Sequence, residues 1–210
     1  MLMRSMRYQK LGHIYHVICR GTGLRPLFLS DQDRNQYLAY LNESREQFSV
    51  KIFNYVLMDH YIHLLLEPQE EESLSKFMEL VSKKYAKYFN KKYKAIGHVF
   101  LRRYKNFVVQ EEKYFLACSR HIDLDPVKEK IAKDPADYVW SGFNQLASGK
   151  VGVLKLDHHK LYEDLGKNDT ERKLLYKTLV VKGLLKNLDV INFRGQAIGD
   201  REFRDQFKKR

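Results

Sequence analysis

The apolar positions of this chain repeat every two residues in some segments and at helical spacing in others, which predicts both strands and helices. Four segments have the alternation or apolar content of β-strands: residues 13–20, 51–58, 58–67 and 98–109. The second and third of these are joined through Asp59 and His60. We therefore expect them to form a tight hairpin.

Apolar residues at helical spacing indicate three helices between or after these strands, starting at Ser30, Ser73 and Glu111. Asp33, three residues after Ser30, should complete a capping box. Pro126 is expected to end the third helix, because proline lacks a backbone N–H and restricts the residue before it.

The predicted order of elements is strand, helix, strand, strand, helix, strand, helix, which is that of a split βαβ, ferredoxin-like α+β sandwich. Such a fold has an antiparallel sheet with helices on one face, and its open face can hold a site. We assign residues 1–143 to this domain and residues 144–210 to a helical C-terminal extension. Tyr138, Trp140 and Phe143 are expected to tether the extension to the core.

Lys and Arg number 38 against 26 Asp and Glu, which gives a net charge of +12 and favours a polyanionic partner. No apolar run approaches the ~18 residues of a membrane span, and residues 1–10 lack the apolar segment of a signal peptide. We expect a cytoplasmic protein without a membrane partner. Cys19 and Cys118 lie in apolar settings, so reduced core thiols are expected in place of a disulfide or a zinc site.

In the segment 58–67, alternation places Ile62 and Leu64 on one face and Tyr61 and His63 on the other. The apolar face should contact the core. By itself, a histidine at such a position is more often a structural residue than a ligand. The rest of the chain changes that balance.

The chain resembles a known family over most of its length, through seven segments that occur in the family's order. These are IYHVICRG, the strand 58–67, SLSKFMELVSKKYAKYFNKKY, GHVFLRRYK, HIDLDPVKEKI, DPADYVWSGF and GQAIGDREF. They are similar to segments of the tyrosine transposases of the HUH class, and within it of the IS200-like, REP-associated tyrosine transposases.

The resemblance implies that residues 1–143 form a DNA-binding and catalytic domain for DNA transposition, with single-stranded or hairpin repeat DNA as its partner. In this family a helix tyrosine attacks a phosphodiester and becomes linked to the 5′-phosphate. A divalent metal, Mg²⁺ or Mn²⁺, is held by a strand His-hydrophobic-His motif and by an amide four residues beyond the tyrosine. Such a metal polarises the phosphate.

This chain departs from the family pattern at both decisive places. The strand motif is Tyr61-Ile62-His63, the helix tyrosine is replaced by His121, and the amide is replaced by Asp125. One hypothesis is that the protein keeps DNA binding but has lost catalysis, because residues that act as a unit fail together. We favour this hypothesis.

A second hypothesis is exchange, in which His63, His121 and Asp125 bind Mg²⁺ or Mn²⁺ and Tyr61 supplies the hydroxyl of an active nicking and strand-transfer enzyme. In a third, His121 itself attacks the phosphate. A different alignment would make His60 a ligand. The alternation argues against it, unless the hairpin bulges.

Two basic groups of residues are candidate DNA contacts. Arg102, Arg103 and Lys105 match a basic segment of the family, and a second group lies on the polar face of the helix that starts at Ser73, comprising Lys83, Lys84 and Lys87. An RNA-binding module is the alternative from another class, because this strand order also serves RNA-recognition folds. The stacking motif of those folds is absent from the sequence, which argues against RNA. The oligomeric state stays open.

Overall fold

The structure is a computed structural model, and it describes residues 11–23, 25–186, 191, 193 and 195–207. The first part of the chain contains β1 (Ile14–Arg20), α1 (Asp31–Gln47), β2 (Val50–Leu57), β3 (Tyr61–Pro68), α2 (Ser73–Tyr93), β4 (Lys105–Val109) and α3 (Glu111–Lys128). The second part contains a 3₁₀ turn (Pro135–Asp137), α4 (Phe143–Ser148), α5 (Lys160–Glu163), α6 (Asp169–Lys186), β5 (Ala197–Ile198) and α7 (Arg201–Asp205). Within the described residues, no helix combines the length and apolar character that a membrane span requires.

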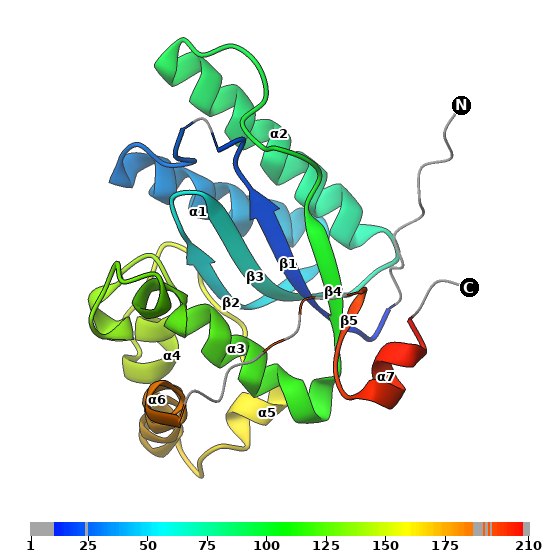
Figure 1. The fold of residues 1–210 in the computed structure, drawn as a ribbon, viewed down its shortest axis with the longest axis vertical. Helices are drawn as coiled ribbons and strands as arrows, with labels where there is room; N and C mark the ends of the chain where they lie inside the picture. Colours follow the sequence, from blue (N-terminus) through cyan, green and yellow to red (C-terminus); the bar gives the residue numbers. More distant parts are fainter. Residues whose placement is uncertain (1–10, 24, 187–190, 192, 194, 208–210) are drawn as a thin grey trace.

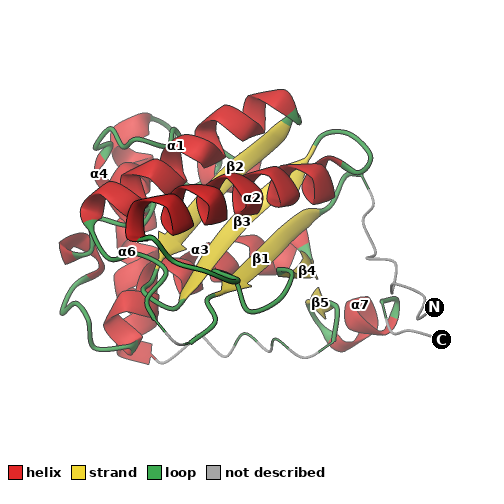
Figure 2. Cartoon of the chain, turned by 90° about the horizontal axis from the view of Figure 1, so that it is seen from above, coloured by secondary structure: helices red, strands yellow, loops and turns green. Residues whose placement is uncertain are grey.

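The strands form one sheet in the order β2-β3-β1-β4-β5 (Figure 1). β2 and β3 form the predicted hairpin, and β1 pairs antiparallel with both β3 and β4. β5 adds to β4 in parallel, so the sheet is mixed. Figure 2 shows β5 and α7 at one side of the molecule, with α4 and α6 at the other. The predicted α+β class and its order of elements are confirmed.

The helices cover both faces of the sheet, which corrects the expectation of helices on one face. Cys19 of β1 lies beside Ser75 and Met78 of α2, while its neighbour Ile18 faces the side where His121 of α3 lies. In Figure 1, α1 and α2 lie behind the strands and α3 lies in front. The strands are buried on both faces, and so their sequences carry apolar residues at both sets of positions.

The fourth strand is shorter than predicted. Residues 105–109 pair with β1, whereas the preceding segment leaves the sheet after a single bridge between Phe100 and Gly21. The segment still attaches to the end of β1, because the Leu101 N–H donates to the Arg20 carbonyl at 2.9 Å. Its basic residues are therefore placed on a loop at the sheet edge.

Pro126 lies inside α3, so the expectation that it ends the helix is wrong. The helix continues to Lys128, and the Glu129 N–H donates to the Asp125 carbonyl at 3.0 Å. Proline removes only one N–H from the last turn, so the helix can continue for two residues beyond it. Asp125 consequently keeps a helical position one turn after His121.

A buried polar network connects α3 to the sheet and to α6. The Asn54 amide on β2 donates to the Ser119 Oγ at 2.8 Å and to Asp123 at 2.9 Å. The Tyr176 hydroxyl of α6 donates to the other Asp123 oxygen at 2.5 Å. Such satisfied networks fix the relative position of the elements that share them.

The predicted tether between the extension and the core is present. The Tyr138 hydroxyl donates to the Leu57 carbonyl at 2.6 Å, and Phe143 is buried in the same core as the sheet. Residues of α6 and β5 also belong to this core. The boundary between residues 143 and 144 stays a prediction. Both cysteines, Cys19 and Cys118, are buried thiols, as expected.

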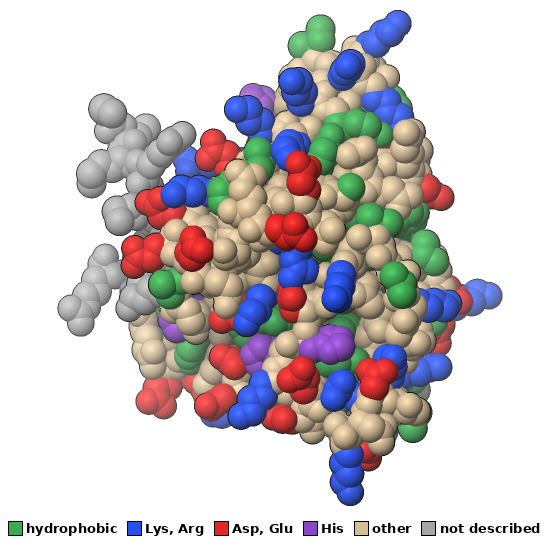
Figure 3. Space-filling model, turned by 180° about the vertical axis from the view of Figure 1, so that it is seen from behind, with side chains coloured by type: hydrophobic (Ala, Val, Ile, Leu, Met, Phe, Trp, Pro, Cys, Tyr) green, Lys and Arg blue, Asp and Glu red, His purple; other side chains and the backbone are tan. Residues whose placement is uncertain are grey.

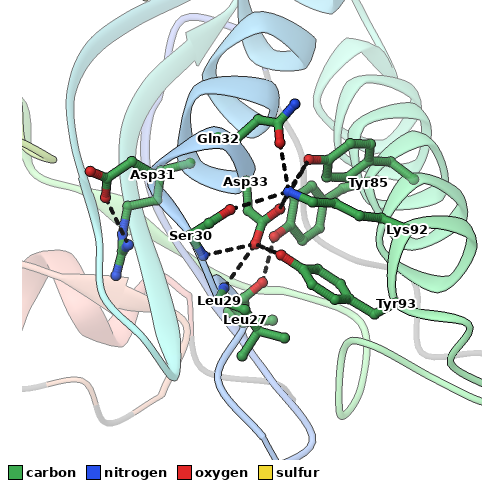
Figure 4. Close-up of polar contacts among 11 residues, drawn as sticks. Leu27, Leu29, Ser30, Asp31, Gln32, Asp33, Tyr85, Lys92 and Tyr93 are labelled. Carbon is green, nitrogen blue, oxygen red and sulfur yellow. Dashed lines mark hydrogen bonds and ion pairs between the residues drawn. The ribbon is translucent and has the colours of Figure 1, made fainter.

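Asp33 holds the start of α1 against the end of α2 (Figure 4). Its carboxylate accepts the N–H groups of Leu29 and Ser30, which confirms a cap at this helix start. It also accepts from Lys92 Nζ at 2.7 Å and from the Tyr93 hydroxyl at 2.7 Å. These hydrogen bonds outweigh the effect of burial and lower the pKa of Asp33 to about 2.

Replacing this carboxylate with a neutral amide should destabilise the protein in a pH-dependent way. Asp33→Asn removes a buried charged acceptor, which we expect to lower the free energy of unfolding by about 3 kcal/mol at pH 7. The folded pKa lies below the unfolded value, so the stabilisation by Asp33 is complete above pH 4 and is lost as the pH falls towards 2. Thermal melts of both proteins at pH 7 and pH 2.5 measure this difference. Equal gaps in Tm at the two pH values would contradict it.

Candidate metal and phosphate site

A cleft of about 610 Å³ opens on the α3 side of the sheet, next to the loop before β4. Its floor is formed by residues of the sheet and of α3, and its rim carries four cations. The lining residues are Ile18, Arg20, Tyr61, His63, Leu101, Arg102, Arg103, Lys105, Phe107, His121, Asp125, Glu129 and Phe193.

His63 points into this cleft because of the alternation of β3. Its neighbours Ile62 and Leu64 are fully buried against the other face, as predicted from the sequence. The His63 side chain is 8% exposed. The strand therefore presents one imidazole to the floor of the cleft.

His121 and Asp125 reach the same place from α3. Four residues separate them, so they share a face of the helix. Asp125 Oδ2 lies 3.6 Å from His63 Nε2, and Asp125 Oδ1 lies 3.7 Å from His121 Nε2. One potential ligand atom from each of the three residues lies within 4.8 Å of the other two. The structure thus brings together the three side chains that the sequence suggested as ligands.

His16 of β1 is a component of the site that the sequence analysis missed. It is fully buried, and its Nε2 lies 2.6 Å from His63 Nδ1. Burial, followed by the proximity of His63 and His121, lowers the pKa of His16 well below its usual value. The imidazole is therefore neutral near pH 7.

The protonation of the remaining residues follows mainly from burial. Burial, with smaller contributions from His121 and Arg20, lowers the pKa of His63 to about 3. Burial also raises the pKa of Asp125 to about 7, opposed by Lys128 and reinforced by Glu129. The distances between Asp125 and the two imidazoles are those of ion pairs, but the low pKa of His63 leaves its ring neutral. The contact between His63 and Asp125 is therefore not an ion pair between two charged groups.

The residues present fit a divalent cation. Two imidazoles and a carboxyl group can offer lone pairs to a common point, and burial leaves the carboxylate in need of a counter-charge. Ligands bound at about 2.1 Å lie roughly 3 Å apart when adjacent, so the observed 3.6 and 3.7 Å would close by small side-chain movements.

Tyr61 lines the cleft beside His63, with 5.2 Å between the ring centroids. Glu129, just after the end of α3, lines the same cleft. Burial, followed by the negative charges of Asp125 and Glu129, raises the pKa of Tyr61. The sequence gave no indication of Glu129, because its position depends on where α3 ends.

The two predicted groups of DNA contacts lie in different places. Arg102, Arg103 and Lys105 line the cleft, together with Arg20, which the sequence analysis did not single out. The second group, on α2, lies on the opposite side of the sheet and does not line the cleft: Lys83, Lys84 and Lys87.

Figure 3 shows this opposite face, with Lys and Arg side chains over the end of α2 at the top and mixed with acidic side chains elsewhere. Lys84 pairs with Glu43 of α1 at 2.8 Å. A role of this second group in DNA binding stays a prediction. His60 is exposed in the hairpin turn and lies outside the cluster of possible ligands found among the described residues.

Comparison with known proteins places this arrangement in context. The model of the family described as "Transposase IS200 like" matches residues 9–124. A solved structure described as a REP-associated tyrosine transposase bound to a REP hairpin is 16% identical, with a TM-score of 0.60, and the match covers 75% of this chain and 93% of that one. A crystal structure of a putative transposase from Deinococcus radiodurans R1 is also 16% identical, with a TM-score of 0.40, 61% of this chain and 92% of that one covered. No curated protein matches the chain.

Cation binding at this site should stabilise the folded protein by mass action. At a Mn²⁺ concentration 100 times the Kd, we expect a gain of about 2.7 kcal/mol, which raises the Tm of a chain of this size by roughly 5 to 10 °C. His121→Ala should abolish this rise, because it removes one of the ligands. Differential scanning calorimetry with and without Mn²⁺ measures the effect.

His98→Ala is the matched control, since His98 is an exposed histidine that lies outside the cluster of candidate ligands, in a neighbouring cleft beside α2. This variant should retain the full Mn²⁺ response. Absence of any response in the wild type at millimolar Mn²⁺ would exclude a functional site and leave only the loss hypothesis.

Proposed function

The chain belongs to the IS200-like transposase family, and we propose that it binds single-stranded or hairpin DNA with a phosphate of that DNA in the cleft above His63. The observation that carries this proposal is the position of the cations relative to the candidate ligands. Arg102, Arg103 and Lys105 line the same cleft as His63, His121 and Asp125. A phosphate between them would face positive charge on the rim and the candidate metal site on the floor.

The proposed cofactor is Mg²⁺ or Mn²⁺, held by His63, His121 and Asp125. When bound, it would act as a Lewis acid towards a phosphate oxygen. The carboxylate favours hard divalent cations, and the two imidazoles favour Mn²⁺ over Mg²⁺ within that group. The side chains of the protein would position the phosphate and exclude water from its buried side.

We propose further that the covalent step of the family, attack by a helix tyrosine, does not occur in this chain. The helix position that faces the site is occupied by His121, which lies with His63 and Asp125 as a candidate metal ligand. It has no hydroxyl group that could act like the tyrosine of the family. The third hypothesis, attack by His121 itself, would remove from the cation one of the three candidate ligands found among the described residues. Binding without cleavage is therefore the function that the site supports best.

One observation favours a second candidate function, DNA nicking and strand transfer with Tyr61 as the nucleophile. The Tyr61 side chain lines the same cleft as Glu129, whose carboxylate could accept the phenol proton during attack. The raised pKa of this phenol opposes attack unless a nearby cation stabilises the phenolate. In-line attack also requires close placement of the oxygen relative to the phosphate.

Other partners are less consistent with the site. We propose a cytoplasmic location for the protein. RNA recognition by this type of sheet uses exposed aromatic residues on central strands. Here α3 packs on that face of β1 and β3, and the part of the face that stays open lines the cleft of the candidate cation site.

The proposal predicts that hairpin or single-stranded DNA binds more tightly than random duplex and that affinity falls with salt. On single strands the log–log slope should be about −0.7 for each phosphate contacted. Replacing Arg102, Arg103 and Lys105 with Ala should weaken binding to all sequences and reduce the slope, because phosphate contacts position DNA without reading bases. Fluorescence anisotropy over a salt series measures both quantities.

Two further triple variants distinguish the loss of phosphate contacts in the cleft from a general effect of lower positive charge. Alanine at Lys83, Lys84 and Lys87 removes the same charge from α2 and tests the second predicted contact surface. Alanine at Lys51, Lys133 and Lys150, which are exposed and outside the cleft, should change affinity by less than the cleft variant. Equal affinity for hairpin and random duplex would refute the proposed preference, and equal losses in all three variants would refute the role of the cleft.

The two candidate functions make opposite predictions for covalent chemistry. If cleavage is lost, the wild type forms no protein–DNA adduct with a hairpin-flanked strand in Mg²⁺ or Mn²⁺, and neither does Tyr61→His or His121→Tyr alone. The double variant Tyr61→His with His121→Tyr recreates the strand histidine pair and the helix tyrosine, and it should form an adduct. A denaturing gel detects the adduct.

Cleavage by the wild type that Tyr61→Phe abolishes would instead establish the second candidate function. If the double variant binds the hairpin but forms no adduct, then the assignment of positions 61 and 121 to the family's histidine and tyrosine is wrong. Binding of the hairpin by every variant is the control for folding.

A further inference from the structure

His16 is a buried polar residue that the proposed function does not yet explain. It lies on β1, which pairs directly with β3 and β4, and Ile18 is the residue opposite His63. His16 is therefore a diagonal neighbour of His63 on the same face of the sheet. It is fully buried and does not line the cleft, so it cannot contact DNA there.

The contact between the two histidines constrains their protons. His16 Nε2 and His63 Nδ1 are 2.6 Å apart, and the rings meet edge to face with centroids 4.9 Å apart. Two neutral imidazoles can share such a contact in two ways, because one nitrogen must donate and the other must accept. Each way fixes which nitrogen of His63 carries a proton.

If His16 donates, His63 carries its proton on Nε2, the nitrogen that faces Asp125. That arrangement blocks the lone pair that a cation requires. If His63 donates from Nδ1, its Nε2 lone pair points to Asp125 and His121, and the proton of His16 lies on Nδ1. The number of protons is the same in both arrangements, so they interconvert without a change of net charge.

We propose that His16 is a positioning residue for the cation site, which accepts the Nδ1–H of His63 and thereby turns the Nε2 lone pair of His63 towards Asp125. This inference rests on the proposed cation site at His63, His121 and Asp125. Hydrogen bonding from the outer nitrogen of a ligating histidine fixes its tautomer and ring orientation, and the usual acceptors are carboxylates, carbonyls or water. Here the acceptor is a second imidazole.

The surroundings of His16 explain why an imidazole suits this position. The ring of Phe193 lies edge to face at a centroid distance of 5.1 Å, and the ring of His121 is 6.1 Å away. Among the described residues, the Nδ1 of His16 has no hydrogen-bond partner, so the proposed arrangement leaves one buried N–H unpaired, a cost that cation binding at His63 must offset. A carboxylate in this apolar enclosure would carry a large desolvation penalty, whereas a neutral imidazole accepts a hydrogen bond without charge.

Substitutions at His16 test the role through cation affinity. Glutamine can place an amide oxygen near the position of Nε2, whereas phenylalanine fills the space without an acceptor. We expect His16→Phe to weaken Mn²⁺ binding about 10- to 100-fold and His16→Gln to stay close to the wild type. Calorimetric titration with Mn²⁺ gives the Kd, and thermal melts without metal report folding.

The wild type provides a test that does not depend on the folding of any variant. With ¹⁵N-labelled histidine and diamagnetic Mg²⁺, long-range ¹H–¹⁵N spectra distinguish protonated from unprotonated ring nitrogens. We expect His63 to be protonated on Nδ1 and His16 on Nδ1 in the cation-loaded protein. A proton on Nε2 of His63 in that state would overturn the assignment, and so would wild-type Mn²⁺ affinity in a folded His16→Phe variant.

His63→Ala distinguishes failure of this inference from failure of the proposed function. If the wild type binds no cation, or if His63→Ala binds as tightly as the wild type, the proposed site is wrong and the role of His16 is wrong with it. If His63→Ala loses binding while His16→Phe retains it, the cation site stands and only the role of His16 is refuted.

Discussion

The pairing of β1 with β3 is the constraint on which the site depends. Its antiparallel register sets Ile18 opposite His63 and places His16 diagonally beside it on the same face. The alternation of both strands sends the neighbouring apolar side chains to the opposite face, against α1 and α2. A shift of one residue in either strand would turn the histidine of that strand away from α3. The fold therefore determines the site before any ligand binds.

The position of α3 is the second requirement, and buried polar contacts provide it. Asn54 of β2 and Tyr176 of α6 both bind Asp123, which lies two residues before Asp125. β2 and α6 thus hold α3 from two sides, with its last turn beside the start of β3. In this way the C-terminal extension contributes to the geometry of a site that contains none of its own candidate ligands.

Much of this arrangement could be predicted from the sequence, because alternation and helical spacing are local properties. They gave the hairpin, the helix starts and the common face of His121 and Asp125. Register between distant strands is not local, so His16 was missed. Strands buried on both faces also carry no pattern that reveals which helix covers which side. The prediction that all helices cover one face was therefore wrong for α3. The loop before β4 was predicted as a strand for a similar reason, since its apolar residues resemble those of a buried strand.

The central claim is that His63, His121 and Asp125 share one divalent cation beneath a basic rim. Anomalous diffraction from a crystal soaked in Mn²⁺ tests it most directly, because it locates the ion independently of any activity. The account predicts one anomalous peak at about 2.1 to 2.3 Å from His63 Nε2, from His121 Nε2 and from an oxygen of Asp125. A well-diffracting crystal without a peak at these three residues, or with Mn²⁺ bound only elsewhere, would contradict it.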